Sequence, residues 1–156
     1  MPELTPVWYL AESPTHAVAE VIQGLRNQSL DQADLVRFGH PLALVPITVT
    51  VAPRDADALG IADLCDPAVL DRFDIRPDVL ASWDFTRTQQ VARQLFHAGA
   101  LGFRWWSALS GDWHTTVLFS ARVVPGGIAF GMPAPLTLAT DAVVDAARRL
   151  AIELPR

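Results

Sequence analysis

The feature that most constrains the fold is the irregular order in which strand-like and helix-like segments follow one another. Runs rich in β-branched and aromatic residues predict strands at 7–10, 41–51, 62–64, 102–107, 115–124 and from 128 onwards. Apolar residues at helical spacing predict helices over about 14–28, 86–97 and from 140 towards Pro155, with shorter helices at 31–37 and 66–73. Because no βαβ unit repeats, the pattern indicates an α+β fold.

The first predicted helix has the clearest start. Ser13 is a favourable N-cap, and Pro14 suits the first helical position. The helix then carries an apolar stripe, which we expect to pack into the sheet: Ala17, Val18, Val21, Ile22 and Leu25. At about 100° per residue, Glu20 lies away from the centre of this stripe, on the side of His16, so it faces either water or a cleft.

Two motifs that could bind a nucleotide have simpler structural interpretations. The segment 125–127 (Pro-Gly-Gly) lies between two predicted strands, which favours a hairpin turn over a phosphate-binding loop. Trp105 and Trp106 could stack on a base, but neighbouring strand residues point to opposite faces. At least one of these tryptophans is therefore expected in the core.

Composition indicates one folded domain spanning residues 1–156. Of the 17.0 kDa chain, 51% is hydrophobic and 19% is charged, which supplies a core and excludes wholesale disorder. The single cysteine, Cys65, excludes an intramolecular disulfide framework and a cysteine-rich zinc site. The four histidines show no HxxxH pairing, so no metal site is expected. This cysteine usage is typical of a reducing cytoplasm.

The charge pattern limits the kinds of partner that the chain is expected to bind. The net charge is −5, and all twelve basic residues are arginines, which argues against a basic nucleic-acid surface and excludes a P-loop or Schiff-base lysine. The start of the sequence lacks the features of a secretory signal. The longest mostly apolar run, residues 42–52, is too short to span a bilayer. We therefore expect a cytoplasmic protein without direct nucleic-acid or membrane binding.

Residue type alone does not decide the role of three polar or aromatic residues. Glu20 fits a solvated helix face or a cleft, Tyr9 fits a partly buried strand aromatic, and Ser107 fits a strand-end hydroxyl. A Ser110/Asp112/His114 cluster lacks the glycine of a nucleophile elbow and is better interpreted as a polar loop. Residue chemistry by itself does not choose a function from these positions.

The sequence of residues 7–21, VWYLAESPTHAVAEV, resembles the signature of the RES-domain family, in which a Y-L-A strand leads into an A-E-V helix. Later blocks are similar to the family in the same order. They are ADLCDP at 62–67, Thr88-Gln89, GFRWWSA at 102–108 and VLF at 117–119. The resemblance therefore extends from residue 7 to about residue 119.

This resemblance implies a fold like that of ADP-ribosyltransferases, with a mixed, mostly antiparallel sheet flanked by helices. Many members are toxins that consume NAD by phosphorolysis, hydrolysis or ADP-ribosyl transfer, so NAD is a substrate and no cofactor is implied. Carried over by motif, Glu20 and Ser107 match the catalytic glutamate and serine, and Tyr9 matches a substrate-pocket tyrosine. Arg104 is offered as a phosphate contact. The arginine of the family signature lies upstream of its Y-L-A segment and has no match here.

The resemblance also implies partners. RES toxins usually accompany an antitoxin that bears a helix-turn-helix and covers the active-site cleft, and they commonly self-associate, so we expect a homodimer. The missing arginine match leaves an alternative from a different class. In that alternative the chain is a RES-like binding or interaction protein that no longer catalyses.

Overall fold

The computed structural model describes residues 6–50, 60–80 and 85–155. The chain forms two compact units, each assembled from two segments far apart in sequence. Unit 1 comprises Met1–Leu10 and Val49–Ile128, and unit 2 comprises Ala11–Thr48 and Ala129–Arg156. Helices combined with a mixed, mostly antiparallel sheet confirm the predicted α+β class. The single domain over 1–156 and the likeness to ADP-ribosyltransferases stay predictions.

In the described part of unit 1, four strands form a mixed sheet. Their order is β1 (Val7–Ala11), β8 (His114–Phe119), β7 (Gly102–Trp106) and β6 (Ile61–Asp63). β7 and β8 are antiparallel, with Phe103 opposite Val117, whereas β6 and β7 are parallel, with Ala62 opposite Phe103. Side chains alternate between the two faces of a strand. The row that contains these three residues therefore forms the apolar face of the sheet.

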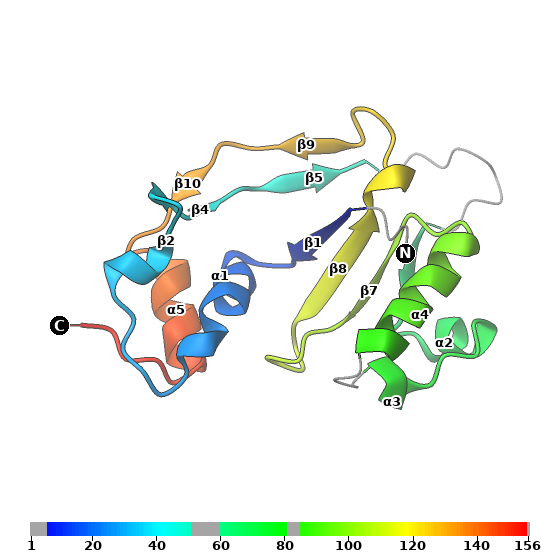
Figure 1. Cartoon of the computed structure of the whole chain (residues 1–156), viewed down its shortest axis with the longest axis horizontal. Helices are drawn as coiled ribbons and strands as arrows, with labels where there is room; N and C mark the ends of the chain where they lie inside the picture. Colours follow the sequence, from blue (N-terminus) through cyan, green and yellow to red (C-terminus); the bar gives the residue numbers. More distant parts are fainter. Residues whose placement is uncertain (1–5, 51–59, 81–84, 156) are drawn as a thin grey trace. The chain divides into compact units, whose positions relative to one another are not determined.

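The core of unit 1 lies between this sheet and its helices. The helices are α2 (Pro67–Arg72), α3 (Pro77–Leu80) and α4 (Phe85–His97), which lie together on one side of the sheet (Figure 1). The predicted inward positions Val91 and Leu95 are confirmed as buried. Gly99 has a φ of 89°, the left-handed conformation that commonly follows the end of a helix. The hydrophobic cluster contains Ala62, Leu64, Leu70, Ile75, Val91, Leu95, Ala100, Phe103, Val117 and Phe119.

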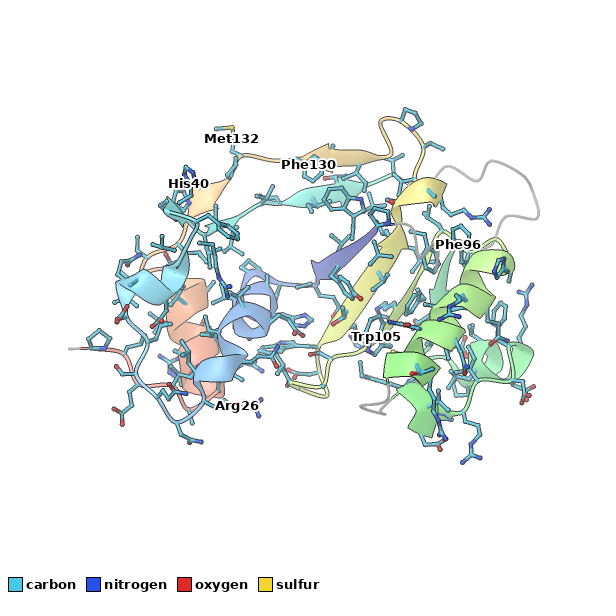
Figure 2. All side chains as sticks on the ribbon, viewed as in Figure 1. Arg26, His40, Phe96, Trp105, Phe130 and Met132 are labelled. Carbon is cyan, nitrogen blue, oxygen red and sulfur yellow. The ribbon has the colours of Figure 1, made fainter. Side chains whose placement is uncertain are left out.

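The two neighbouring tryptophans of β7 separate as strand geometry requires. Trp105 packs against the core and stacks on Phe103 with ring centroids 5.1 Å apart. Figure 2 labels Trp105 and also Phe96 of α4, which packs against the same core. Trp106, on the opposite face of the strand, is 41% exposed. The expectation that at least one tryptophan is core is therefore confirmed, and it is Trp105.

Unit 2 is built around two helices that lie side by side. They are α1 (Pro14–Ile22) and α5 (Asp141–Arg149) (Figure 1). Most of their buried side chains are small or β-branched, which allows the helix backbones to approach closely. The buried side chains are His16, Val18, Ala19 and Ile22 on α1, and Ala142, Val143, Ala146 and Ala147 on α5.

Short elements complete unit 2. The 3₁₀ helices are η1 (Gln23–Leu25) and η2 (Gln32–Leu35). Strand β2 (Val36–Arg37) pairs with β3 (His40–Pro41), and β4 (Ala43–Leu44) pairs with β10 (Ala134–Pro135). β5 (Ile47–Val49) pairs with β9 (Ile128–Phe130), and the boundary between the units passes through both strands. Pro46 separates β4 from β5, which confirms the predicted interruption there.

The predicted apolar stripe of the first helix is wrong at several positions. Val21 is 45% exposed, and Ala17 and Leu25 are half-buried, whereas His16 and Ala19 are completely buried. The α-helix also ends at Ile22 instead of near residue 28 and tightens into η1. Packing on α5 selects an arc shifted towards His16, and His16 tolerates burial there because Glu20 is a hydrogen-bond partner for its ring.

The hairpin predicted at residues 125–127 is also wrong. The turn itself exists, since the Gly127 N–H donates to the Val124 carbonyl at 2.8 Å and Gly126 has a φ of 77°. However, β8 ends at Phe119 and is followed by η3 (Ser120–Arg122), and β9 pairs with β5 and not with β8. The intervening helical turn redirects the chain, so a local turn signal does not give the strand partner.

The last helix is shorter than predicted. α5 ends at Arg149. Ala151, which the sequence predicts on the apolar face, is exposed with a φ of 55°, and Ile152 is buried instead. Thr140 is the N-cap residue, but its hydroxyl accepts from the Thr137 backbone N–H instead of an N–H of the helix. The apolar pattern beyond residue 149 therefore belongs to the following turn.

Candidate functional site

Glu20 lies in the last turn of α1. Because α1 begins after the N-cap Ser13, both His16 and Glu20 are in the helix. The Ser13 hydroxyl accepts from the His16 backbone N–H at 3.1 Å, and Pro14 occupies the first turn, as the sequence predicts. Residues four positions apart lie one above the other on a helix. His16 is therefore the residue directly below Glu20.

Side chains one turn before and one turn after Glu20 contact the two oxygens of its carboxylate. Oε1 lies 3.1 Å from His16 Nε2, and Oε2 accepts from Gln23 Nε2 at 3.2 Å. Gln23 also donates to the Glu20 carbonyl at 3.0 Å. The His16 side chain is 0% exposed and that of Glu20 is 38% exposed. Glu20 is thus anchored on a buried ring and remains accessible to solvent.

Tyr9 lies on β1 and is 70% exposed. Its neighbour Trp8 points to the other face of the strand and is 42% exposed. The expectation of a partly buried strand aromatic is therefore wrong for the Tyr9 ring, most of which is accessible in the described structure. An exposed aromatic ring of this kind can stack on a planar ligand.

Ser107 follows β7 directly and is 7% exposed. Its N–H donates to the Trp113 carbonyl at 2.8 Å, and its hydroxyl oxygen accepts from the Leu109 N–H at 3.1 Å. Within the same loop, the Ser110 hydroxyl donates to Asp112. Ser107 therefore shapes the loop after β7. A hydroxyl can accept and donate at once, so the contact with Leu109 does not by itself consume its O–H donor.

Arg104 forms an ion pair across the parallel strands β6 and β7. Its Nη1 donates to Asp63 Oδ2 at 2.8 Å, and the two residues are opposite each other in the strand register. Asp63 Oδ1 accepts from the Cys65 N–H at 3.0 Å. Burial raises the pKa of Asp63, but the Cys65 N–H and the Arg104 guanidinium together lower it below its ordinary value. A phosphate bound by Arg104 would have to compete with this carboxylate.

The site residues matched by motif are distributed over both units. Tyr9, Arg104 and Ser107 belong to unit 1, on or directly after strands of the four-stranded sheet. Glu20 belongs to unit 2. A common pocket that contains Glu20, Tyr9 and Ser107 stays a prediction.

His16 and Gln23 both contact the Glu20 carboxylate, although neither is a predicted site residue. Their positions four residues before and three residues after Glu20 were the available signal, because both spacings place side chains on one helix face. That spacing alone does not distinguish a hydrogen bond from two side chains that point apart. The burial of His16 became visible only with the packing of α1 on α5.

Over residues 6–50, 60–80 and 85–155, we find no group of three or more His, Cys, Asp and Glu side chains placed to hold a metal ion. Within the same ranges, no helix combines the length and the apolar character needed to cross a membrane.

These observations define an α+β protein with an anchored, accessible glutamate on α1 and a buried serine after β7. The sequence model of the RES domain matches residues 2–139, and the chain belongs to this family. The match includes Tyr9, Glu20, Arg104 and Ser107, and it confirms the resemblance found in the sequence. No curated protein and no solved structure matches the chain.

Proposed function

We propose that this protein is a RES-type toxin that cleaves the bond between nicotinamide and ribose in NAD. The observation that carries the proposal is the family match over residues 2–139. This range includes Glu20, Ser107 and Tyr9, which the motif resemblance aligns with the glutamate, serine and tyrosine of the family signature. The acceptor of the ADP-ribosyl group is phosphate, water or a nucleophilic side chain of another protein. Each acceptor gives nicotinamide as the common product.

The chemistry of this bond suits an anchored carboxylate. As the C–N bond breaks, its electron pair leaves with nicotinamide, and positive charge develops on the ribose as in an oxocarbenium ion. The ring is cationic in NAD and departs neutral, so no proton donor is required. A carboxylate held in advance stabilises the developing charge without having to reorganise. In this proposal Glu20 is that carboxylate, and its two anchored oxygens support the role.

The remaining residues would bind substrate. The exposed ring of Tyr9 would stack on the cationic nicotinamide ring, and the Ser107 hydroxyl would bind ribose or the carboxamide. Arg104 would contact phosphate in exchange for its bond to Asp63. Because the arginine side chain is 32% exposed, solvent reaches the pair and such an exchange is feasible.

The test measures nicotinamide release from NAD by the purified chain, with and without inorganic phosphate. We expect wild-type protein to release nicotinamide and Glu20→Gln, which keeps the size and removes the charge, to lose at least about 100-fold in kcat. Glu153→Gln changes another exposed glutamate and is the matched control, expected to retain full activity. Equal rates in wild type and Glu20→Gln would contradict the assignment. No release under any condition would favour the non-catalytic binding protein.

The toxin context adds a partner and an assembly to this proposal. A helix-turn-helix antitoxin would cover the residues that bind NAD, and a homodimer is the expected form of the chain. Light scattering after size exclusion tests the assembly. A single 17.0 kDa species at micromolar concentration would contradict self-association.

A further inference from the structure

We infer that His16 and Gln23 are positioning residues that hold the Glu20 carboxylate in one orientation for reaction. This inference rests on the proposed function of Glu20. The inference is based on three side chains of α1 and the 3₁₀ turn that follows it, namely His16, Glu20 and Gln23. One side chain from the turn before Glu20 and one from the turn after it contact different oxygens of the same carboxylate.

The location of Glu20 in its helix explains why a carboxylate there requires such support. Glu20 lies in the last turn of α1, where the carbonyl end of the helix dipole disfavours negative charge. No basic residue lies in that turn to compensate. The side-chain contacts of His16 and Gln23 with the carboxylate act against this unfavourable interaction.

The two anchors differ in rigidity. His16 is fully buried in unit 2, and its backbone N–H is bonded to the N-cap hydroxyl of Ser13, so its ring is a fixed reference point. Gln23 is exposed, but its amide donates to both the carboxylate and the backbone carbonyl of Glu20. The fixed anchor sets the direction of the side chain, and the second limits its rotation.

The bond also determines the tautomer of His16. An ionised carboxylate only accepts hydrogen bonds, so the proton of a neutral His16 ring must be on Nε2. Preorganised groups near a reacting centre are effective because their geometry does not change during the reaction. Loss of a partner that orients a metal ligand typically costs about 10- to 100-fold in activity, and we expect a loss of this order when Glu20 loses its contact with His16. The inference therefore predicts a loss in kcat without a matching loss in substrate binding.

The kinetic test uses NAD with two kinds of His16 variant. His16→Leu removes the donor and keeps an apolar side chain in a buried position, and we expect kcat to fall about 10- to 100-fold with KM within about threefold. His16→Gln places an amide nitrogen the same number of bonds from Cα as Nε2. We expect it to recover most of the lost kcat, a rescue that a purely structural role would not produce.

A second pair of variants tests the inference at exposed positions, where a substitution is not expected to disturb folding. Gln23→Met changes an exposed side chain, and we expect about a threefold to tenfold loss in kcat. Gln28→Met is the matched control, because Gln28 is exposed and donates to the Gly24 carbonyl, and it should leave kcat unchanged. If both His16→Leu and Gln23→Met retain the wild-type kcat while Glu20→Gln is inactive, the inference is overturned and the proposed function stands.

A measurement without activity tests the contact itself. In ¹⁵N-histidine spectra of the whole chain, His16 should carry its proton on Nε2, and its signals should shift in Glu20→Ala but not in Glu153→Ala. A His16 ring protonated on Nδ1 alone would overturn the inference. Absence of nicotinamide release by wild-type protein would overturn the proposed function and, with it, the role given to His16.

Discussion

The sheet of unit 1 and the helix pair of unit 2 obtain their cores by different means. Unit 1 packs large side chains, since Phe103, Phe119 and Trp105 meet between the sheet and α4. Unit 2 packs α1 on α5 largely through alanine and valine. Large rings fill space between elements, whereas small residues let two backbones approach closely. The two units should therefore fail under different substitutions.

The difference between a strand and a helix also determines how each unit exposes a charged side chain. A strand has two complete faces, so β7 packs Phe103 and Trp105 against the core on one face and carries Arg104 on the other. A helix packed on one side has a buried arc with two edges, and Glu20 lies next to such an edge, beside buried His16. The arginine is consequently paired across strands, while the glutamate is held by its own helix.

The largest expected effect is in the unit 1 sheet, at Gly102. A Cβ at this position would overlap the Val117 carbonyl oxygen and lie 3.0 Å from Leu118 Cα, both backbone atoms of the paired strand β8. Relief requires the two strands to separate, so Gly102→Ala should lower the free energy of unfolding by about 3 kcal/mol or more. Urea unfolding checks this. Gly24→Ala, where a Cβ meets open space, is the control. Equal stability of both variants would refute the close approach.

A smaller loss is expected from overfilling the helix pair of unit 2. Ala146 is 0% exposed on the face of α5 that packs in unit 2, and Ala146→Leu adds three carbon atoms there. We expect the free energy of unfolding to fall by about 2 kcal/mol, because the helices must move apart. Ala68→Leu, at an exposed position of α2, should change it by less than about 0.5 kcal/mol. Thermal and urea unfolding of the two variants give the comparison.

The smallest expected effect concerns the polar face of the unit 1 sheet, at Asp63. Its pKa in the folded protein is below the ordinary 3.8, so its contribution to stability is present above that value and is lost as the pH falls through the lower folded-state pKa. Because the Asp63 side chain is 42% exposed, Asp63→Asn should cost less than about 1 kcal/mol at pH 7.

The check on Asp63 is urea unfolding of wild type and Asp63→Asn at a series of pH values. The difference between the two proteins should narrow as the pH is lowered past 3.8. Asp145→Asn, in the exposed pair with Arg148 on α5, shows how much an ordinary surface pair contributes. A difference that is constant from pH 7 to about pH 2 would contradict the lowered pKa.

Local signals in the sequence predicted local structure well. Ser13 and Pro14 start α1, Pro46 interrupts the strand region, and the glycine after α4 follows the end of that helix. These features depend on the backbone conformations and hydrogen bonds of a few adjacent residues. Pairing between distant strands does not, which is why the turn at Gly126 was predicted and the pairing of β9 with β5 was not.

For the candidate site, the sequence by itself determined the family, the helix that carries Glu20 and the strand that precedes Ser107. It could do so because motifs and periodicity depend only on residues that are close together in the sequence. The tertiary structure decided that His16 is buried, that Val21 is exposed and that Arg104 is paired with Asp63. Each of these depends on an element far away in the chain, α5 for the helix and β6 for the arginine. Packing selects among the faces that a periodic sequence offers, and a sequence pattern alone leaves that selection open.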